Sequence, residues 1–386
     1  MSVLGVALSD IALVIFALAG IAFLGLSLRH VLAAREDTAT PDQTEYPPLS
    51  VLKPLCGAEP RLYECLRSFC TQDYPAPVQY VFGLREANDP AALVVERLQA
   101  EFPALDITLV CDARLHGANL KISNVLNILE ACRHDQLLIS DSDVMVASDC
   151  FRHVVAAMVE PDIGAVSCLY KGAPAKGLVP LLGAMNINDW LLPSVLLDQA
   201  LNGVDSALGP VMLLRRQALE AIGGLGTVAN YLAEDYEIGR MLEQTGWRVR
   251  LSLHGIDTMV EETELGALFR HEVRWAHTVR AVRPTDHLLS VVTCVLPVLL
   301  ALHLVHPTGW GGGLLGIYLV LRLALHWAVE RRFAFAVKAP LWLVPPREIL
   351  CFAVWFYSLF SRAVVWRGQP YRLLPGGRLV PLDTAD

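Results

Sequence analysis

The sequence predicts an α/β protein built on a doubly wound, mostly parallel sheet, with membrane segments at both ends of the chain. From residue 49 onwards, short apolar runs typical of strands buried on both faces alternate with helical patterns. Hydrophobic residues make up 54% of the 386 residues and charged residues only 18%, with a mean hydropathy of +0.43. This balance exceeds ordinary globular usage and indicates membrane spans.

The first apolar run, Ile11–Leu28, is uncharged over its 18 residues and is long enough to cross a hydrocarbon core. The opening MSVLGVALSD lacks the basic segment that begins a secretory signal peptide. Arg29 and Arg35 follow the run, which by the positive-inside rule puts the next residues in the cytoplasm. We expect residues 1–35 to form an N-terminal transmembrane helix and the polar residues 36–48 to form a linker.

Three further apolar segments lie near the other end: Leu288–Val305, Leu314–Val329 and Ile349–Val365. The second contains Arg322 and the third contains Arg362. Basic residues flank the third segment on both sides, so it fits a re-entrant or interfacial segment as well as a full crossing. We expect two or three membrane segments in residues 287–366 and a basic tail in residues 367–386, on a side of the membrane that the sequence leaves open.

Between the membrane segments, residues 49–286 are predicted to form one cytosolic domain. Its predicted strands are 50–55, 78–84, 106–111, 137–140, 163–169 and 208–214, and its predicted helices are 60–71, 121–132, 232–246 and one that begins at Asn88-Asp89-Pro90. Helices of this length between successive strands favour a parallel sheet. The apolar stretch Leu178–Leu201 is either a core helix or a surface that lies on the bilayer.

Charge and cysteine usage exclude several classes of protein. The formal net charge of −8 provides no basic field for nucleic acid. The nine cysteines are scattered without a C-x-x-C pair, which favours reduced core residues over disulfides or a zinc site. We also expect the scattered histidines to form no histidine–carboxylate pair typical of zinc or iron.

The stretch LLISDSDVMV, residues 137–146, contains the strongest candidate for a ligand site. Asp141 and Asp143 follow a buried strand directly, where open α/β sheets bind their ligands. Two carboxylates at alternate positions suit a divalent cation that shares its coordination shell with water and a diphosphate. The motif alone is weak, because an Asp-Ser-Asp turn that caps a helix is common.

Five further candidates each have a structural alternative. Asp235 suits a general base, although an acidic first turn stabilises any helix by up to about 1 kcal/mol. Asp89 suits a helix cap, and Lys121 can reach a phosphate or simply be solvated. Arg274 can brace a diphosphate, while Trp275 can pack on a sugar or anchor at the membrane interface.

Taken in order, these motifs resemble those of a known family. A transmembrane helix is followed by N-D-P, K-x-x-N, D-S-D, L-A-E-D-Y and R-W, and then by a hydrophobic tail. The order resembles the ceramide glucosyltransferase family, which is inverting glycosyltransferase family 21 with a GT-A fold. The bacterial glycosyltransferases of hopanoid biosynthesis share the resemblance. It covers nearly the whole chain, from about residue 10 to the WRGQPYR segment at 366–372.

The resemblance implies transfer of one sugar from a UDP-sugar to a lipid hydroxyl with inversion, assisted by Mg²⁺ or Mn²⁺. It implies that Asp89 helps to hold the nucleotide, that Asp141 binds the metal and diphosphate, and that Asp235 is the catalytic base. Asp143 departs from the eukaryotic motif, which has no acid there, and completes a metal pair.

The resemblance also extends to a substrate-binding signature that ends in Arg274 and Trp275. Its first position is His271 here, where the family has Gln or Arg. Because of this departure, the sequence does not determine whether His271 makes the contact to acceptor or diphosphate that the resemblance implies. Lys121, in K-x-x-N, is the remaining substrate-binding candidate.

The expected acceptor is ceramide, with glucose as the sugar, or a hopanoid polyol, with N-acetylglucosamine. The expected location is a bacterial inner membrane, with a cytoplasmic catalytic domain. A processive polysaccharide synthase is the alternative enzyme, but it needs enough spans for a polymer channel. A membrane scaffold without catalytic activity is the alternative outside the enzymes. The presence of all four acidic residues, Asp89, Asp141, Asp143 and Asp235, weighs against it.

Overall fold

The computed structural model describes residues 3–35, 45–203, 207–360, 363–366 and 369–382. The chain divides into two compact units, which we name by their content. The helical unit comprises Met1–Arg35, Gly172–Leu201 and Val260–Gly376, and the sheet unit comprises Glu36–Lys171, Asn202–Met259 and Gly377–Asp386. Most of the predicted linker, residues 36–44, lies outside the described residues.

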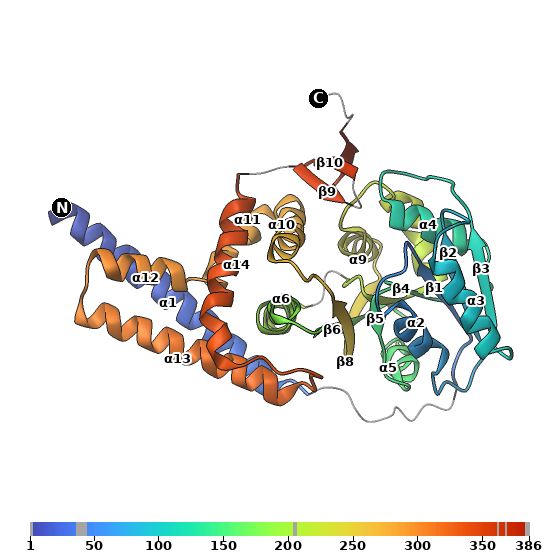
Figure 1. The fold of residues 1–386 in the computed structure, drawn as a ribbon, viewed down its shortest axis with the longest axis horizontal. Helices are drawn as coiled ribbons and strands as arrows, with labels where there is room; N and C mark the ends of the chain where they lie inside the picture. The colour runs from blue at the N-terminus through green and yellow to red at the C-terminus, as the bar shows by residue number, and fades with distance from the viewer. Residues whose placement is uncertain (1–2, 36–44, 204–206, 361–362, 367–368, 383–386) are drawn as a thin grey trace. The chain divides into compact units, whose positions relative to one another are not determined.

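The main sheet has the strand order β3-β2-β1-β4-β7-β6-β8-β5 (Figure 1). Its strands are β1 Leu49–Pro54, β2 Val78–Leu84, β3 Asp106–Cys111, β4 Gln136–Ser140, β5 Val144–Met145, β6 Ile163–Pro174, β7 Val211–Arg215 and β8 Arg248–Val260. Strands β3, β2, β1 and β4 are parallel neighbours, as the sequence predicted. The pairs β4–β7, β7–β6 and β5–β8 are antiparallel, so the sheet is mixed with a parallel half.

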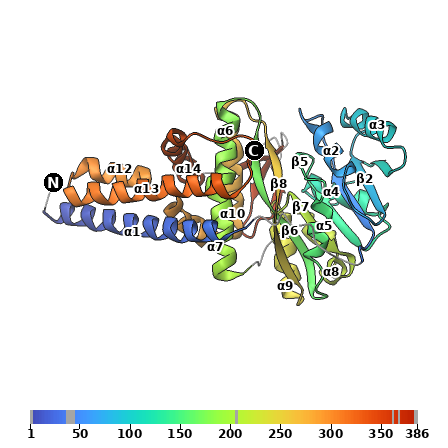
Figure 2. The ribbon, with the colours of Figure 1, turned by 90° about the horizontal axis from the view of Figure 1, so that it is seen from below.

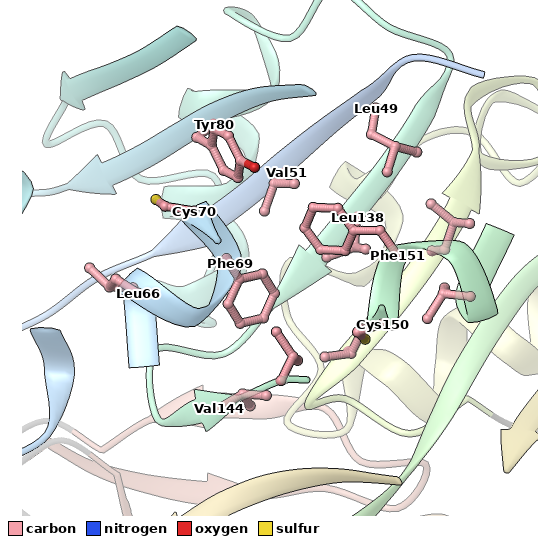
Figure 3. Packing of buried hydrophobic residues seen from close by; sticks show 14 of the residues in the cluster. Leu49, Val51, Leu66, Phe69, Cys70, Tyr80, Leu138, Val144, Cys150 and Phe151 are labelled. Carbon is pink, nitrogen blue, oxygen red and sulfur yellow. The ribbon is translucent and has the colours of Figure 1, made fainter. Parts of the chain in front are cut away.

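Alternate residues of each strand point to opposite sides of the sheet. In the parallel half the residues on both sides are apolar, and helices cover both faces. Val51 and Leu138 belong to one core cluster, and Leu52 and Ile139 belong to the other. Figure 3 shows the first cluster, in which the ring centroids of Phe69 and Phe151 lie 6.0 Å apart. The helices of this unit are α2 Leu62–Cys70, α3 Ala91–Glu101, α4 Leu120–Leu129, α5 Cys150–Ala156, α8 Arg216–Ala221, η2 Leu225–Val228 and α9 Glu234–Gln244, and a short strand, β11 Leu379–Pro381, follows.

All nine cysteines are free, as expected from their scattered positions. Most are at least partly buried, but Cys56 and Cys111 are exposed and are therefore not core residues.

The helical unit is built mainly from long apolar helices. Its elements are α1 Val3–Ala33, α6 Leu178–Met185, a π-helix Asn186–Leu191, α7 Leu192–Asn202, α10 Leu265–Val282, α11 Pro284–Leu289, η3 Ser290–Thr293, α12 Leu296–Val305, α13 Gly309–Arg332, η4 Leu341–Leu343, α14 Val344–Ser358 and the antiparallel pair β9 Ala363–Trp366 and β10 Gln369–Leu373. Trp190, in the middle of the predicted stretch 178–201, is buried, in line with the core-helix alternative.

Two helices of the described residues are long and apolar enough to cross a membrane, Asp10–Ala33 and Gly309–Arg332. Helices α1, α12 and α13 run together in both views (Figures 1 and 2). Gly20 permits the close approach of α1 to α13, because a Cβ at this position would lie 2.8 Å from the Tyr318 ring. The predicted N-terminal span and the predicted segment 314–329 therefore lie in paired helices.

The other two predicted segments are not continuous helices. The segment 288–305 bends by 62° between η3 and α12, forming a broken span or a re-entrant loop. The bend precedes Pro297, in the first turn of α12, because proline starts a helix readily but cannot continue one. In the segment 349–365, α14 ends at Ser358 and strand β9 follows at Ala363, so the described part of this segment is not one continuous helix, in line with the alternative to a full crossing.

Candidate active site

The Asp141–Asp143 turn leaves the sheet at the carboxyl end of β4, as predicted. The Asp141 N–H donates to the Pro210 carbonyl at 3.1 Å, and the Met259 N–H donates to the Asp143 carbonyl at 2.9 Å. Both aspartates are therefore held by main-chain hydrogen bonds, at the edge where parallel sheets bind ligands.

Lys121 links this turn to the segment that contains Asp235. Its ammonium Nζ lies 2.6 Å from Asp141 Oδ1 and 2.8 Å from Glu234 Oε1. Asn119, the N-cap of α4, accepts from the Ile122 N–H with its Oδ1 and donates from Nδ2 to Glu234 Oε2 at 3.0 Å. The first turn of α4 thus binds β4 to α9, and Lys121 makes ion pairs instead of being solvated.

Asp235 is the second residue of α9, next to the bridged Glu234. A Cβ at Gly209 would lie 2.9 Å from Asp235 Oδ2, so glycine leaves room for this carboxylate. Burial and the charge of Glu234 raise the pKa of Asp235 to about 6, although Lys121 opposes the shift. At neutral pH the carboxylate is mostly ionised and able to accept a proton.

Burial also raises the pKa of Asp143, to about 7, and the neighbouring charges of Asp141 and Glu59 add to the shift. No hydrogen bond or ion pair from another described residue reaches its carboxylate. Two adjacent carboxylates that resist simultaneous ionisation are a suitable donor set for a hard divalent cation, which would replace the proton.

Tyr170 shows that the three aspartates share one location. It is a partly buried residue of β6, and its pKa is raised by burial and then by the charges of Asp235, Asp141 and Asp143. These carboxylates come from two separate parts of the chain, the turn after β4 and the start of α9. The arrangement can bind a cation beside a proton acceptor.

Asp89 has a local structural role. Its carboxylate accepts from the Gly57 N–H at 2.9 and 3.0 Å and from the Ala91 N–H at 2.9 Å. It therefore caps the start of α3, and it fixes the loop after β1, where Gly57 has a positive φ of 74°. Any effect of Asp89 on a nucleotide would act through this loop.

His271, Arg274 and Trp275 all lie on α10, in the helical unit. His271 Nδ1 pairs with Glu262, and its ring meets the edge of Trp275 at 4.8 Å between centroids. The neighbouring Glu272 is buried and accepts two hydrogen bonds of 2.8 Å from Arg347. Helix α10, which carries these three residues, is therefore anchored to α14 by a buried ion pair.

The sequence contains no histidine–carboxylate motif typical of zinc or iron, but the fold brings two histidines to one carboxylate. His153 and His254 place Nε2 atoms 3.3 and 3.7 Å from the carboxylate of Asp149. The two rings are stacked, with centroids 4.2 Å apart and planes 13° apart. A metal binds in the plane of a ligating imidazole about 2.0–2.1 Å from nitrogen, so these parallel rings cannot share one ion as arranged. We place no metal at this cluster.

Three residues near the aspartates were not predicted from the sequence: Lys53, Glu234 and Tyr170. Lys53 interrupts an otherwise apolar predicted strand, a signal that was present in the sequence. In the sequence, Glu234 was recognisable only as an acidic residue in the first turn of a helix. No sequence feature indicated Tyr170 as a site residue. Asn124, considered for ligand binding, instead donates to the carbonyl of Gly83 at 2.9 Å inside the core.

Comparison with known proteins agrees with this fold. The chain is 24% identical over 356 residues to ceramide glucosyltransferase 3 of Caenorhabditis elegans, covering 88% of this chain and 76% of that protein. It is also 24% identical over 391 residues to ceramide glucosyltransferase 1 of the same organism, covering 95% and 81%.

Among solved structures, the chain is similar to the mannosyltransferase PcManGT from Pyrobaculum calidifontis in complex with GDP-Man and Mn²⁺. The TM-score is 0.55 at 20% identity, over 92% of this chain and 99% of that one. This likeness shows the GT-A-like fold.

The sequence model of the family described as Glycosyl transferase family 21 matches residues 12–379. The resemblance identified from the motifs is thus confirmed over nearly the whole chain: this protein is a glycosyltransferase with membrane helices and belongs to glycosyltransferase family 21.

Proposed function

We propose that this protein transfers one sugar from a UDP-sugar to the hydroxyl of a membrane lipid, with inversion at the anomeric carbon. The observation that carries the proposal is the convergence of Asp141, Asp143 and Asp235, where Lys121 links Asp141 to Glu234, the residue before Asp235. Sugar transfer from a nucleotide diphosphate needs positive charge for the leaving group and a base for the attacking hydroxyl. The cluster offers carboxylates for both tasks.

Asp141 and Asp143 are the residues that would hold a divalent cation, Mg²⁺ or Mn²⁺. Such an ion neutralises the charge that develops on the leaving diphosphate. The support is the raised pKa of Asp143 and the lack of another described partner for its carboxylate. The solved mannosyltransferase of similar fold is in complex with GDP-Man and Mn²⁺, which is compatible with this assignment.

Asp235 is the proposed general base. The lipid oxygen attacks the anomeric carbon as its proton passes to the Asp235 carboxylate, and the bond to the diphosphate breaks with its electron pair on UDP. A single displacement from the opposite face inverts the configuration. The ionised state of Asp235 at neutral pH suits this role.

Further residues are proposed to bind substrate. Lys121 would contact the diphosphate, and Asp89 would support the nucleotide through the loop at Gly57. From α10, we propose that Arg274 braces the diphosphate and Trp275 packs on a sugar. His271 would contact acceptor or diphosphate in place of the family's Gln or Arg.

The names of the curated relatives favour ceramide as acceptor and glucose as sugar, and a hopanoid polyol with N-acetylglucosamine is the second choice. We propose that residues 49–286 act at the cytoplasmic face of a bacterial inner membrane. Residues 1–35 and 287–366 would be the membrane segments, with 36–48 as the linker and 367–386 as the tail. The basic residues after the first span support this orientation.

The test of the function uses membranes that contain the protein, radiolabelled UDP-glucose or UDP-N-acetylglucosamine, and lipid extraction. A labelled lipid supports the proposal, and mass spectrometry identifies its acceptor. A labelled polymer would instead indicate a processive polysaccharide synthase. Donor binding without any labelled product would indicate a non-catalytic scaffold.

Replacing the metal-binding carboxylates should weaken donor binding. We expect Asp141→Ala and Asp143→Ala each to lower UDP affinity in Mn²⁺ at least tenfold and to remove the effect of Mn²⁺ or Mg²⁺, because the cation loses a ligand. Calorimetric titration of UDP with and without the cation measures this. Asp149→Asn, at the histidine cluster, is the matched control and should retain the metal effect. Metal-stimulated binding that survives both alanine variants would place the cation elsewhere.

Replacing the base should remove turnover but not binding. We expect Asp235→Asn to lower kcat by about 10²–10⁴-fold, because a general base contributes this much. UDP affinity should stay within about twofold of the wild type, because a general base acts on the attacking hydroxyl and not on UDP. The control is Glu237→Gln on the same helix, whose carboxylate pairs with Arg240. A larger loss of UDP affinity than of kcat would contradict the assignment.

The pH profile should report the same group. Burial raises the pKa of Asp235 to about 6, and the base must be ionised to act. At saturating cation, kcat/KM should therefore rise about tenfold per pH unit below this pKa and level off above it. Initial rates between pH 4.5 and 8 provide the measurement. A rate that is flat from pH 5 to 7 would exclude Asp235 as the titrating base.

A further inference from the structure

We propose that Lys53 is a positioning residue for the Asp141–Asp143 turn, which it holds through hydrogen bonds from its ammonium group to the Asp141 carbonyl and Ser140 Oγ. The inference rests on the proposed function, since it assigns this turn to cation binding. It adds a residue outside the motifs from which the family resemblance was drawn.

Lys53 lies near the end of β1, beside β4, where Leu52 pairs in register with Ile139. Lys53 is fully buried. Its Nζ donates to the Asp141 carbonyl at 2.7 Å and to Ser140 Oγ at 3.1 Å, and lies 3.5 Å from the centroid of the Phe69 ring. An ammonium group has three N–H donors, and these two oxygens and one aromatic face match them.

A charged side chain is a costly way to fill this space, since Leu or Met would occupy a similar volume without desolvating an ion. Burial indeed lowers the pKa of Lys53 to about 8, although nearby Asp141 and Asp143 oppose the shift. The ammonium group contacts the Asp141 carbonyl and Ser140 Oγ, and this placement points to a role at the turn and not in general packing.

Lys53 and Lys121 contact Asp141 in different ways. Lys121 pairs with the Asp141 carboxylate itself, so it competes with a cation for that oxygen. Lys53 bonds the main-chain carbonyl of Asp141 and not its carboxylate. Lys53 can thus keep its contacts while a cation is bound, as a fixed support requires.

The experiment uses the full-length protein in detergent with Mn²⁺ and UDP as probes. Lys53→Met should raise the Mn²⁺ concentration for half-maximal UDP binding at least tenfold, because the Asp141 carbonyl loses the shorter of its two hydrogen bonds and keeps only the one from Ser140 Oγ at 3.2 Å. UDP affinity without Mn²⁺ should change less than twofold. Ser140→Ala removes one contact of Lys53 and the bond from Ser140 Oγ to the Asp141 carbonyl. It should shift the Mn²⁺ requirement in the same direction, which tests the proposal even if Lys53→Met does not fold.

Ser50→Ala is the matched control. Ser50 lies on the same strand, is fully buried and donates to Gln79 Oε1 at 2.9 Å, at the opposite end from the turn. It should lower the unfolding temperature without changing the Mn²⁺ requirement. A Lys53→Met protein that is destabilised but keeps the wild-type Mn²⁺ requirement, or that binds Mn²⁺ more tightly, overturns the inference alone. A wild-type protein whose UDP binding ignores Mn²⁺ and Mg²⁺ overturns the metal assignment as well.

Discussion

The bridge from Lys121 to Asp141 and Glu234 is the interaction on which the candidate site depends. It joins the start of α4, the end of β4 and the start of α9, which are distant in sequence. The Glu234 carboxylate is buried and Lys121 is only partly exposed, so removing one partner would leave the other charge with reduced access to water. The bridge therefore favours the placement of Asp235, next to Glu234, near the Asp141 turn.

The same region holds more carboxylates than ammonium groups. Burial raises the pKa of Asp143 and Asp235, which shows that the protein does not by itself stabilise every negative charge there. Lys53 and Lys121 offset part of this negative charge. This excess of negative charge is an electrostatic condition that favours cation binding.

In the helical unit, polar groups are turned inward from apolar helices. Arg322, which made one predicted segment less apolar, is buried against the Trp190 ring and lies 3.6 Å from Glu348. His326 Nδ1 lies 2.9 Å from Asp189 on the π-helix. Charged groups inside apolar segments are retained when they pair in the interior, so Arg322 does not argue against a membrane location for α13.

The sequence alone determined the family, the parallel half of the sheet and the position of Asp141 and Asp143, because these follow from short apolar runs, local motifs and their order. It did not determine the break before Pro297, the stacked histidines beside Asp149, or the contacts of Lys53 and Lys121. Those depend on which distant elements lie side by side, and the pattern within one element contains no information on its neighbours. Only the tertiary structure could decide that a lysine in a strand and an acid in a helix's first turn belong to one site.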